Sequence, residues 1–264
     1  MTARKSLAHL MLASFPLPTL PTLTIAILGA LFAGFTSGFA GFGTALVASG
    51  IWLYVLPAPM VPPLTVILSV AGQIVSLATI RHAFDWRSTL PYFAGAVIGV
   101  PLGIAALAAA SPLVIKLAVG SFLIAYSLYQ LLQRKSINIG QWGGKFADGI
   151  VGPGGGVLGG FAGLSGPLPL IWLQLRGGPR DRQRATYQPF NLVVLAMASV
   201  GMAFSGQVTF NVLTIALICF PATFVGALLG ARAYVRVSPT TFQRVVLGML
   251  LVSGCVLLMS SIGG

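Results

Sequence analysis

Charged residues are scarce in this chain: they make up 7% of 264 residues, while 56% are hydrophobic and the mean hydropathy is +0.95. A soluble core could not bury that much apolar surface, and apolar runs repeatedly approach the roughly 20 residues that cross a bilayer. The composition therefore excludes an ordinary soluble domain and predicts an all-α integral membrane protein. We expect one integral domain, because no stretch between the apolar runs is long enough to fold alone.

Acidic residues are the scarcest charged type, with three against fifteen Lys and Arg. Asp85, Asp148 and Asp181 all fall in basic stretches that we predict to be loops. No carboxylate is then expected at membrane depth, where a proton relay or a sodium site would need one. The sequence therefore disfavours a cation pathway.

Cysteine and histidine are also few. Cys219 and Cys255 lie in apolar segments without CxxC spacing, and His9 and His82 have no partner pattern. These counts exclude a disulfide framework and predict neither a metal site nor a cofactor. The apolar segments hold no recognisable cluster of nucleophile, base and metal ligand, so we expect no enzyme and no catalytic residue. We expect no nucleic-acid partner.

Glycine, by contrast, is abundant and recurs in a pattern. Residues 38–47 read GFAGFGTALV and residues 160–169 read GFAGLSGPLP, so two glycine-rich breaks lie about 120 positions apart in apolar text. The GxxxG motif that begins at Gly99 recurs 127 positions later at Gly226, and we assign both motifs to close helix packing. The pattern indicates an internal duplication.

Each half is predicted to contain five helical segments bounded by Pro, Gly and charged residues. They cover 22–37, 43–56, 62–80, 89–109 and 113–133, and then 150–163, 167–175, 187–204, 209–231 and 240–260. The predicted organisation is an N-terminal leader or interfacial segment over 1–21, a membrane repeat over 22–133, a basic cytoplasmic linker over 134–149 and a second repeat over 150–264.

The first two segments of each half are too short for a hydrocarbon core of about 30 Å, at roughly 1.5 Å per residue. We therefore expect glycine-broken, re-entrant-like helix pairs that turn back at the breaks. Because each pair then returns to the side from which it entered, each half crosses the membrane an odd number of times and the two repeats are inverted. This topology places twelve basic residues on one side, with only Arg4, Lys5 and Lys116 on the other. The positive-inside rule then makes the basic loops cytoplasmic and both termini external.

Unwound backbone at membrane depth is tolerated where it lines a cavity, so the two breaks are the predicted binding site. Their N–H groups and the helix N-termini beside them would bind an anion without a charged side chain. The predicted substrate-binding residues are Gly38, Gly41, Phe42, Gly43, Thr44, Gly160, Gly163, Ser165, Gly166, Gln188 and Asn191. Thr65 and Gln73 are further candidates, and interhelical hydrogen bonding is the alternative for the polar residues outside the breaks.

Several motifs resemble the TauE/SafE sulfite exporter family over about residues 24–260. They are the doubled breaks GFAGFG and GGFAGLSGPLP, the loop FDWR at 84–87 and the run RATYQPFN at 184–191. The resemblance implies a bacterial inner-membrane permease for sulfite, sulfoacetate or another sulfur-containing or organic anion. Many members have a GxGGG run where this chain has Gly41-Phe42-Gly43-Thr44, and here Phe42 is placed to act as a gate. The hairpin cysteines of a related thiosulfate transporter group are absent, which argues against thiosulfate relay chemistry.

We therefore expect a permease that exports such an anion, driven by the membrane potential, which supplies about 2.3 kcal/mol per charge per 100 mV. An anion channel and a proton-coupled uptake permease for an organosulfur anion are the alternatives. The expected partners are a small anionic substrate and the lipid bilayer, and the sequence leaves a homodimer open.

Overall fold

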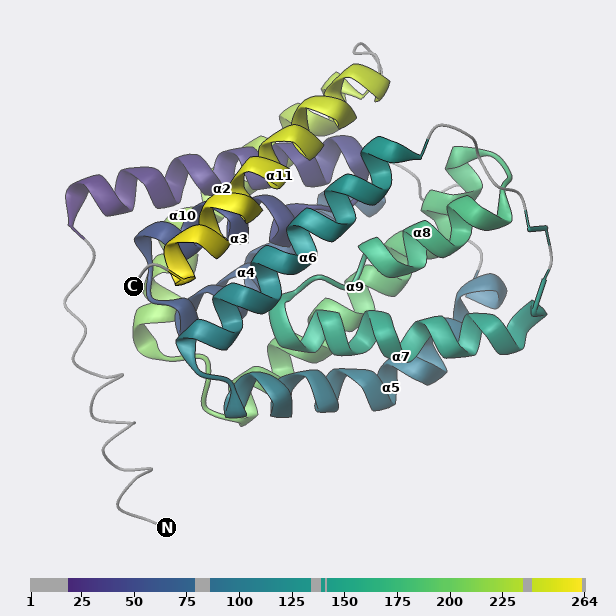
Figure 1. Cartoon of the computed structure of the whole chain (residues 1–264), viewed down its shortest axis with the longest axis horizontal. Coiled ribbons are helices and arrows are strands. Elements are labelled where there is room, and N and C mark those ends of the chain that lie inside the picture. Colours follow the sequence, from purple (N-terminus) through teal and green to yellow (C-terminus); the bar gives the residue numbers. More distant parts are fainter. Residues whose placement is uncertain (1–18, 79–85, 134–138, 141, 235–238, 263–264) are drawn as a thin grey trace.

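The computed structural model describes residues 19–78, 86–133, 139–140, 142–234 and 239–262, and every regular element in these ranges is helical (Figure 1). The first-half elements are α2 (Leu20–Ala40), α3 (Thr44–Val55), the 3-10 turn η1 (Ala58–Met60), α4 (Val61–Ala78), α5 (Trp86–Ala109) and α6 (Pro112–Leu132). The second-half elements are α7 (Gly144–Ala162), α8 (Pro167–Arg176), α9 (Arg180–Phe204), α10 (Phe210–Ala233) and α11 (Pro239–Ile262). Most of the predicted leader, His82 and Asp85 lie outside the described residues.

Seven stretches of the described chain are long and apolar enough to cross a membrane: α2, η1 with α4, α5, α6, α9, α10 and α11. Large apolar side chains such as Phe210, Leu217 and Val252 are exposed on the outer faces of these helices. Apolar surface on that scale is unfavourable in water and favourable against lipid. The structure therefore supports the predicted multi-pass membrane protein.

The ten predicted helical segments are all present, and the largest extensions beyond the predicted bounds are in α2, α7 and α9. α2 contains 21 residues and is one of the seven candidate spans, so the expectation that it is too short to cross was wrong. α7 begins at Gly144 and α9 at Arg180, six and seven residues before the predicted starts at 150 and 187. Asp148 and Asp181 therefore lie in helices, and their assignment to loops was also wrong.

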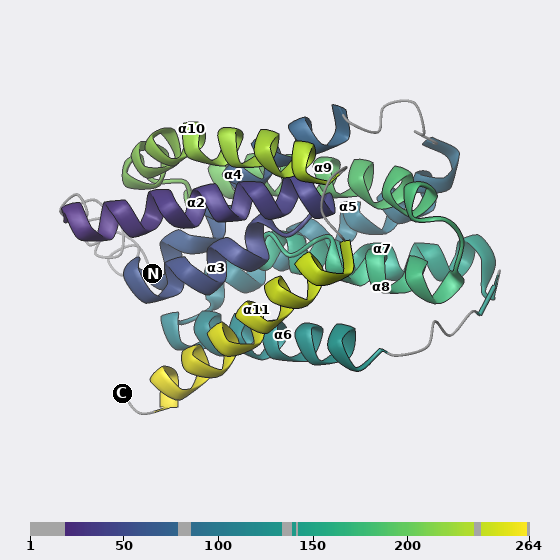
Figure 2. The same ribbon diagram turned by 90° about the horizontal axis from the view of Figure 1, so that it is seen from above.

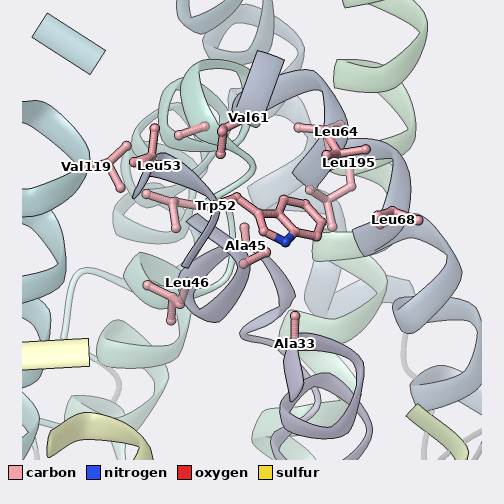
Figure 3. Packing of buried hydrophobic residues seen from close by; sticks show 14 of the residues in the cluster. Ala33, Ala45, Leu46, Trp52, Leu53, Val61, Leu64, Leu68, Val119 and Leu195 are labelled. Atoms are coloured by element: carbon pink, nitrogen blue, oxygen red, sulfur yellow. The ribbon is translucent and has the colours of Figure 1, made fainter. Parts of the chain in front are cut away.

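The centre of the molecule is α4. About 78% of the span that contains α4 is buried inside the protein, compared with 22% for α11. Trp52 of α3 is fully buried in this core, where Figure 3 shows its indole among Ala45, Leu64 and Leu195. Its ring N–H donates to the carbonyl oxygen of Ala26 at 3.1 Å and so ties α3 to α2.

Glycines bring two helix pairs, α2 with α10 and α5 with α7, into backbone contact. A Cβ atom added at Gly38 would lie 2.0 Å from the carbonyl oxygen of Ala227, and one at Gly160 would lie 2.3 Å from that of Val100. Equally close approaches occur at Gly34, Gly99, Gly103, Gly226 and Gly230. The packing role predicted for the GxxxG glycines is confirmed, and the same contacts explain why α2 and α7 stay helical through their glycines.

This packing predicts that Gly230→Ala destabilises the protein, because the new methyl group would lie 2.0 Å from the carbonyl oxygen of Phe35 and push α2 and α10 apart. Overpacking typically costs about 1–3 kcal/mol, which corresponds to a fall of several degrees in the unfolding temperature of detergent-purified protein. Gly248→Ala on α11 is the matched control, since no heavy atom lies within 4 Å of its added Cβ. Equal unfolding temperatures for the two variants would contradict the interface.

Candidate substrate site

The two glycine breaks lie near the middle of the molecule. α2 and α7 begin at opposite ends, and each is followed by a short helix that runs back alongside it (Figure 2). Gly41 and Gly163, the residues that follow the two helices, have φ of 80° and 73°, and Gly43 before α3 has φ of 109°. Side chains with a Cβ atom rarely adopt this left-handed backbone, so glycine is what lets the chain reverse here.

The two breaks touch each other. A Cβ atom built on Gly166 would lie 3.1 Å from the Cβ of Phe42, and one built on Gly163 would lie 3.3 Å from the Cβ of Ala45. The structure thus brings together two segments that the sequence separates by about 120 positions. The ring of Phe42 packs edge-on against Tyr126 and Tyr187, at centroid distances of 6.3 and 5.9 Å.

The carbonyl groups released where α2 and α7 end are satisfied by side chains of α4 and α9. The Thr65 hydroxyl shares its proton between the carbonyl of Pro62 on its own helix at 2.8 Å and that of Ala162 at 3.3 Å, and Gln73 donates to the carbonyl of Gly41 at 3.1 Å. Tyr187 of α9 donates to the carbonyl of Ala40 at 2.6 Å. Inside a membrane such carbonyls have no water to accept from, so these side chains are what make the breaks tolerable.

A narrow cavity lies where the breaks meet. Its walls come from both breaks, α4 and α9: Phe42, Gly43, Thr44, Ala45, Leu46, Ser69, Gln73, Gly163, Leu164, Gly166, Pro167, Asn191 and Leu195. None of these residues carries a charge. The volume open to the centre of a water molecule in this cavity is only about 10 Å³, which is room for about one water. An anion of several atoms needs the two breaks to move apart.

Three of the lining side chains have unused hydrogen-bonding atoms. Thr44 Oγ1, Ser69 Oγ and Gln73 Oε1 have no protein partner, and each residue is only 2% exposed. The equally unpartnered Ser37 Oγ lies next to Thr44, since a Cβ atom added at Gly72 would be 3.0 and 3.1 Å from the two hydroxyl oxygens. Buried polar atoms are nearly always hydrogen-bonded, so this concentration indicates a place for water or a ligand.

Backbone N–H groups add to this donor set, mainly from the first break. No side chain caps the start of α3, so the amides of Thr44, Ala45 and Leu46 have no acceptor within the helix. At the start of α8, Pro167 and Pro169 have no N–H and leave only Leu168 in the first turn. Both helix starts favour negative charge through the helix dipole, but α3 supplies more donors.

Two predicted residues hold the second break in shape. Ser165 donates to Asn191 Oδ1 at 2.5 Å, and a Cβ atom added at Gly166 would be 2.7 Å from Asn191 Nδ2. Both side chains are buried, and Asn191 also lines the cavity. Asn191 therefore lies at the predicted site and also makes the structural hydrogen bond that was its alternative role.

Four other predicted residues are not part of the cavity wall: Gly38, Gly41, Gly160 and Gln188. Gly38 and Gly160 are within helices at the backbone contacts described above. Gln188 packs behind the first break, where a Cβ atom added at Gly41 would be 1.9 Å from the end of its amide group, and it hydrogen-bonds Ser76. Gln188 is therefore separated from the cavity by the turn at Gly41.

Sequence reasoning missed Ser69. The residue lies on α4 between Thr65 and Gln73, each four positions away, so the three share one helix face. The same face continues to Ser76, which makes a polar stripe on an otherwise apolar buried helix. This spacing is visible in the sequence and is the signal that could have identified it.

Asp148 lies in a buried polar cluster. Its carboxylate accepts hydrogen bonds from Tyr92 at 2.7 Å and Trp172 at 2.8 Å, and forms an ion pair with Arg176 at 2.8 Å. Arg176 also donates to the carbonyl of Gly144 at 2.6 Å and packs over the Trp172 ring. The cluster joins α5, α7 and α8, and it holds a carboxylate within the helical body that the sequence had placed in a loop.

Seven candidate spans around a cavity with polar donors define a multi-pass membrane protein of the transporter class. The family model named "Sulfite exporter TauE/SafE" matches residues 26–257, so the chain belongs to the sulfite exporter TauE/SafE family. A Cupriavidus necator protein named "Probable sulfite/organosulfonate exporter TauE" is 27% identical over 229 residues, which cover 84% of this chain and 88% of that protein. No solved structure gives a significant match.

The Asp148 cluster predicts that Asp148→Ala is strongly destabilising, because the mutation leaves the Arg176 guanidinium without its counter-charge. Breaking a largely buried ion pair from one side costs on the order of 3 kcal/mol. The double variant Asp148→Ala, Arg176→Met should recover part of the loss in unfolding temperature, whereas Arg232→Gln, an exposed arginine on α10, should have little effect. An Asp148→Ala protein as stable as wild type would show that the cluster contributes nothing.

Proposed function

We propose that this protein is a carrier that exports sulfite, an organosulfonate or a similar small anion across the bacterial inner membrane. The observation that carries the proposal is the cavity between the breaks, which offers unpartnered hydroxyl groups and free amides but no charged side chain. Hydroxyl and amide N–H donors that converge on one place stabilise an anion, and no carboxylate lines the cavity to favour a cation. The name of the Cupriavidus necator relative and the name of the family support the same substrate class.

We infer that the chain consists of two inverted repeats whose glycine-broken helix pairs enter the membrane from opposite sides. The reciprocal packing supports this: the first helix of each half packs on the fourth helix of the other, α2 on α10 and α7 on α5. α3 and α8 contain 12 and 10 residues, about 18 and 15 Å, and neither can cross a core of about 30 Å. Movement of one pair against the other would open the cavity to alternate sides.

The topology and the driving force follow from charge. With inverted repeats, the positive-inside rule makes the basic loops cytoplasmic and both termini external. An inside-negative potential of 100 mV then favours outward movement of a divalent anion by about 4.6 kcal/mol, which sustains roughly a thousandfold gradient. Proton coupling is less well supported, because the Asp148 carboxylate is paired with Arg176 and lies outside the cavity wall.

A channel would use the same donors, but the geometry favours a carrier. The cavity has room for about one water and is lined by Phe42 and by the second break. A site that must widen to admit its anion is expected to saturate and to turn over slowly, whereas an open pore does neither.

The transport proposal predicts that proteoliposomes loaded with sulfite lose it saturably when an inside-negative potential is imposed, and lose sulfate or acetate more slowly. The potential acts on the charge of the anion, so collapsing it with an ionophore should slow the loss. A rate of sulfite loss that does not depend on the imposed potential would contradict uniport. Flux that never saturates would identify a channel, and flux of a larger organic anion alone would change the substrate.

The site proposal predicts that Thr44→Val raises the KM for sulfite roughly tenfold to hundredfold. This is the change expected when one hydrogen bond to a charged group is lost. Unfolding temperature should not fall, because the hydroxyl that is removed is buried and has no protein partner. Thr214→Val on the exposed face of α10 removes a hydroxyl that bonds only its own helix, and it should leave KM unchanged. Equal KM values for both variants would remove Thr44 from the site.

A further inference from the structure

Gln73 gives the central cavity a hydrogen-bond acceptor beside its donors. The residue lines the cavity and is only 2% exposed. Its amide nitrogen donates to the carbonyl of Gly41 at 3.1 Å. This bond fixes the orientation of the amide group, because the reversed amide would place its oxygen against the carbonyl oxygen. The amide oxygen, Oε1, has no hydrogen-bond partner among the described residues.

Oε1 differs from the other unpartnered atoms around it. The hydroxyl groups of Ser37, Thr44 and Ser69 can turn to donate or to accept, whereas an amide oxygen carries no proton and can only accept. None of these three hydroxyl groups is bonded to Oε1, since all four atoms are without a partner. A buried acceptor without a partner is unfavourable, so Oε1 needs a hydrogen atom from a molecule in the cavity.

The molecule that supplies this hydrogen atom changes when the substrate binds. Before binding, one water molecule is enough, and the cavity has room for about one. An anion that enters displaces that water. A bare oxyanion would then bring a negatively charged oxygen against the lone pairs of Oε1, which repel it. An anion with an O–H group of its own would donate to Oε1 and accept from the hydroxyl groups and amides on its other side.

Sulfite can carry such a proton. It is protonated in part near neutral pH, and hydrogen sulfite, HO–SO₂⁻, then presents one O–H donor and two acceptor oxygens on a single negative charge. Sulfate keeps no proton at this pH and presents acceptors only. The proton therefore distinguishes two oxyanions of similar size, and an uncharged cavity with one fixed acceptor can detect it.

We propose that the central cavity binds hydrogen sulfite rather than the sulfite dianion, with the O–H group of the ion donating to Oε1 of Gln73. The inference rests on the proposed transport function and names the species that the carrier moves. The other two oxygens of the ion accept from Thr44, Ser69 and the amides at the start of α3. The proton arrives with the ion from bulk water, so the cavity needs no acid or base. One charge crosses per ion, and the membrane potential acts on half the charge of the dianion.

Calorimetric titration of the purified full chain with sodium sulfite identifies the bound species without a transport assay. Between about pH 7.5 and about pH 8.5 hydrogen sulfite becomes scarce, so the apparent Kd for total sulfite should rise roughly fivefold to tenfold. At the higher pH, binding should take up about one proton per ion, measured from the heats in two buffers with different ionisation enthalpies. Equal or tighter binding at the higher pH without proton uptake would overturn the inference and leave the transport function standing. No sulfite binding at either pH would reject sulfite as the substrate as well.

The ionisable groups of the protein should contribute little to this pH dependence. None of the described residues that line the cavity is ionisable. Tyr126 and Tyr187 contact the wall through Phe42, and an ordinary tyrosine hydroxyl titrates at about pH 10. Arg184 bonds Gln188 behind the first break, and arginine keeps its charge throughout this range. Hydroxyethanesulfonate, which carries a hydroxyl group and a single charge at both pH values, is the ligand control. A rise in its Kd as large as that for sulfite would assign the pH dependence to the protein and overturn the inference.

Replacing Gln73 tests the acceptor itself. Gln73→Leu removes Oε1, so the Kd for total sulfite should become nearly independent of pH over this range. Ser69→Ala removes a hydroxyl group from the same helix face, and it should weaken binding at both pH values while keeping the wild-type pH dependence. A Gln73→Leu protein that keeps that dependence would overturn the role of Oε1. If loss of the donor to Gly41 prevents folding, the proton uptake of the wild-type protein decides.

Discussion

Broken helices inside a membrane must find hydrogen-bond partners for their freed backbone groups, and the rest of this structure depends on how α4 and α9 supply them. The carbonyls at the ends of α2 and α7 accept from Gln73, Tyr187 and Thr65. An unsatisfied carbonyl in hydrocarbon costs several kcal/mol, on the order of the whole stability of many domains. The polar stripe of α4 therefore fixes where the chain can break, and the cavity lies where two such breaks face each other.

The polar stripe of α4 contains both hydrogen-bonded and unpartnered polar groups. Thr65 and the Gln73 amide nitrogen are used to hold the breaks, whereas Ser69, between them, has no protein partner. A helix that needed polar residues only for support would not bury an idle hydroxyl at the junction of two helix starts. The combination of supported backbone and unused donors is what points to a binding site.

The helices and both breaks could be predicted from the sequence because they depend on local signals, namely apolar length, glycine and proline. The roles of individual glycines could not. Gly38 and Gly41 are three residues apart, yet one contacts Ala227 of α10 and the other reverses the chain, and only the partner helix distinguishes them. Asp148 and Asp181 were assigned to loops because charged residues usually mark loop ends, but α7 and α9 begin at Gly144 and Arg180 and include them.

The two breaks share the sequence GFAG but differ chemically at the site, and this difference bears on mechanism. The first break presents the amides of α3 together with Thr44, while the two prolines of α8 remove donors from the second. Within the second pair, α7 and α8 are joined by the Asp148–Arg176 ion pair, whereas within the first pair α2 and α3 are joined by the uncharged bond from Trp52 to Ala26. An anion in the cavity would thus meet most of its donors on the first pair. One set of donors where the two breaks meet is enough to bind an anion there, so binding does not require the two breaks to be chemically alike.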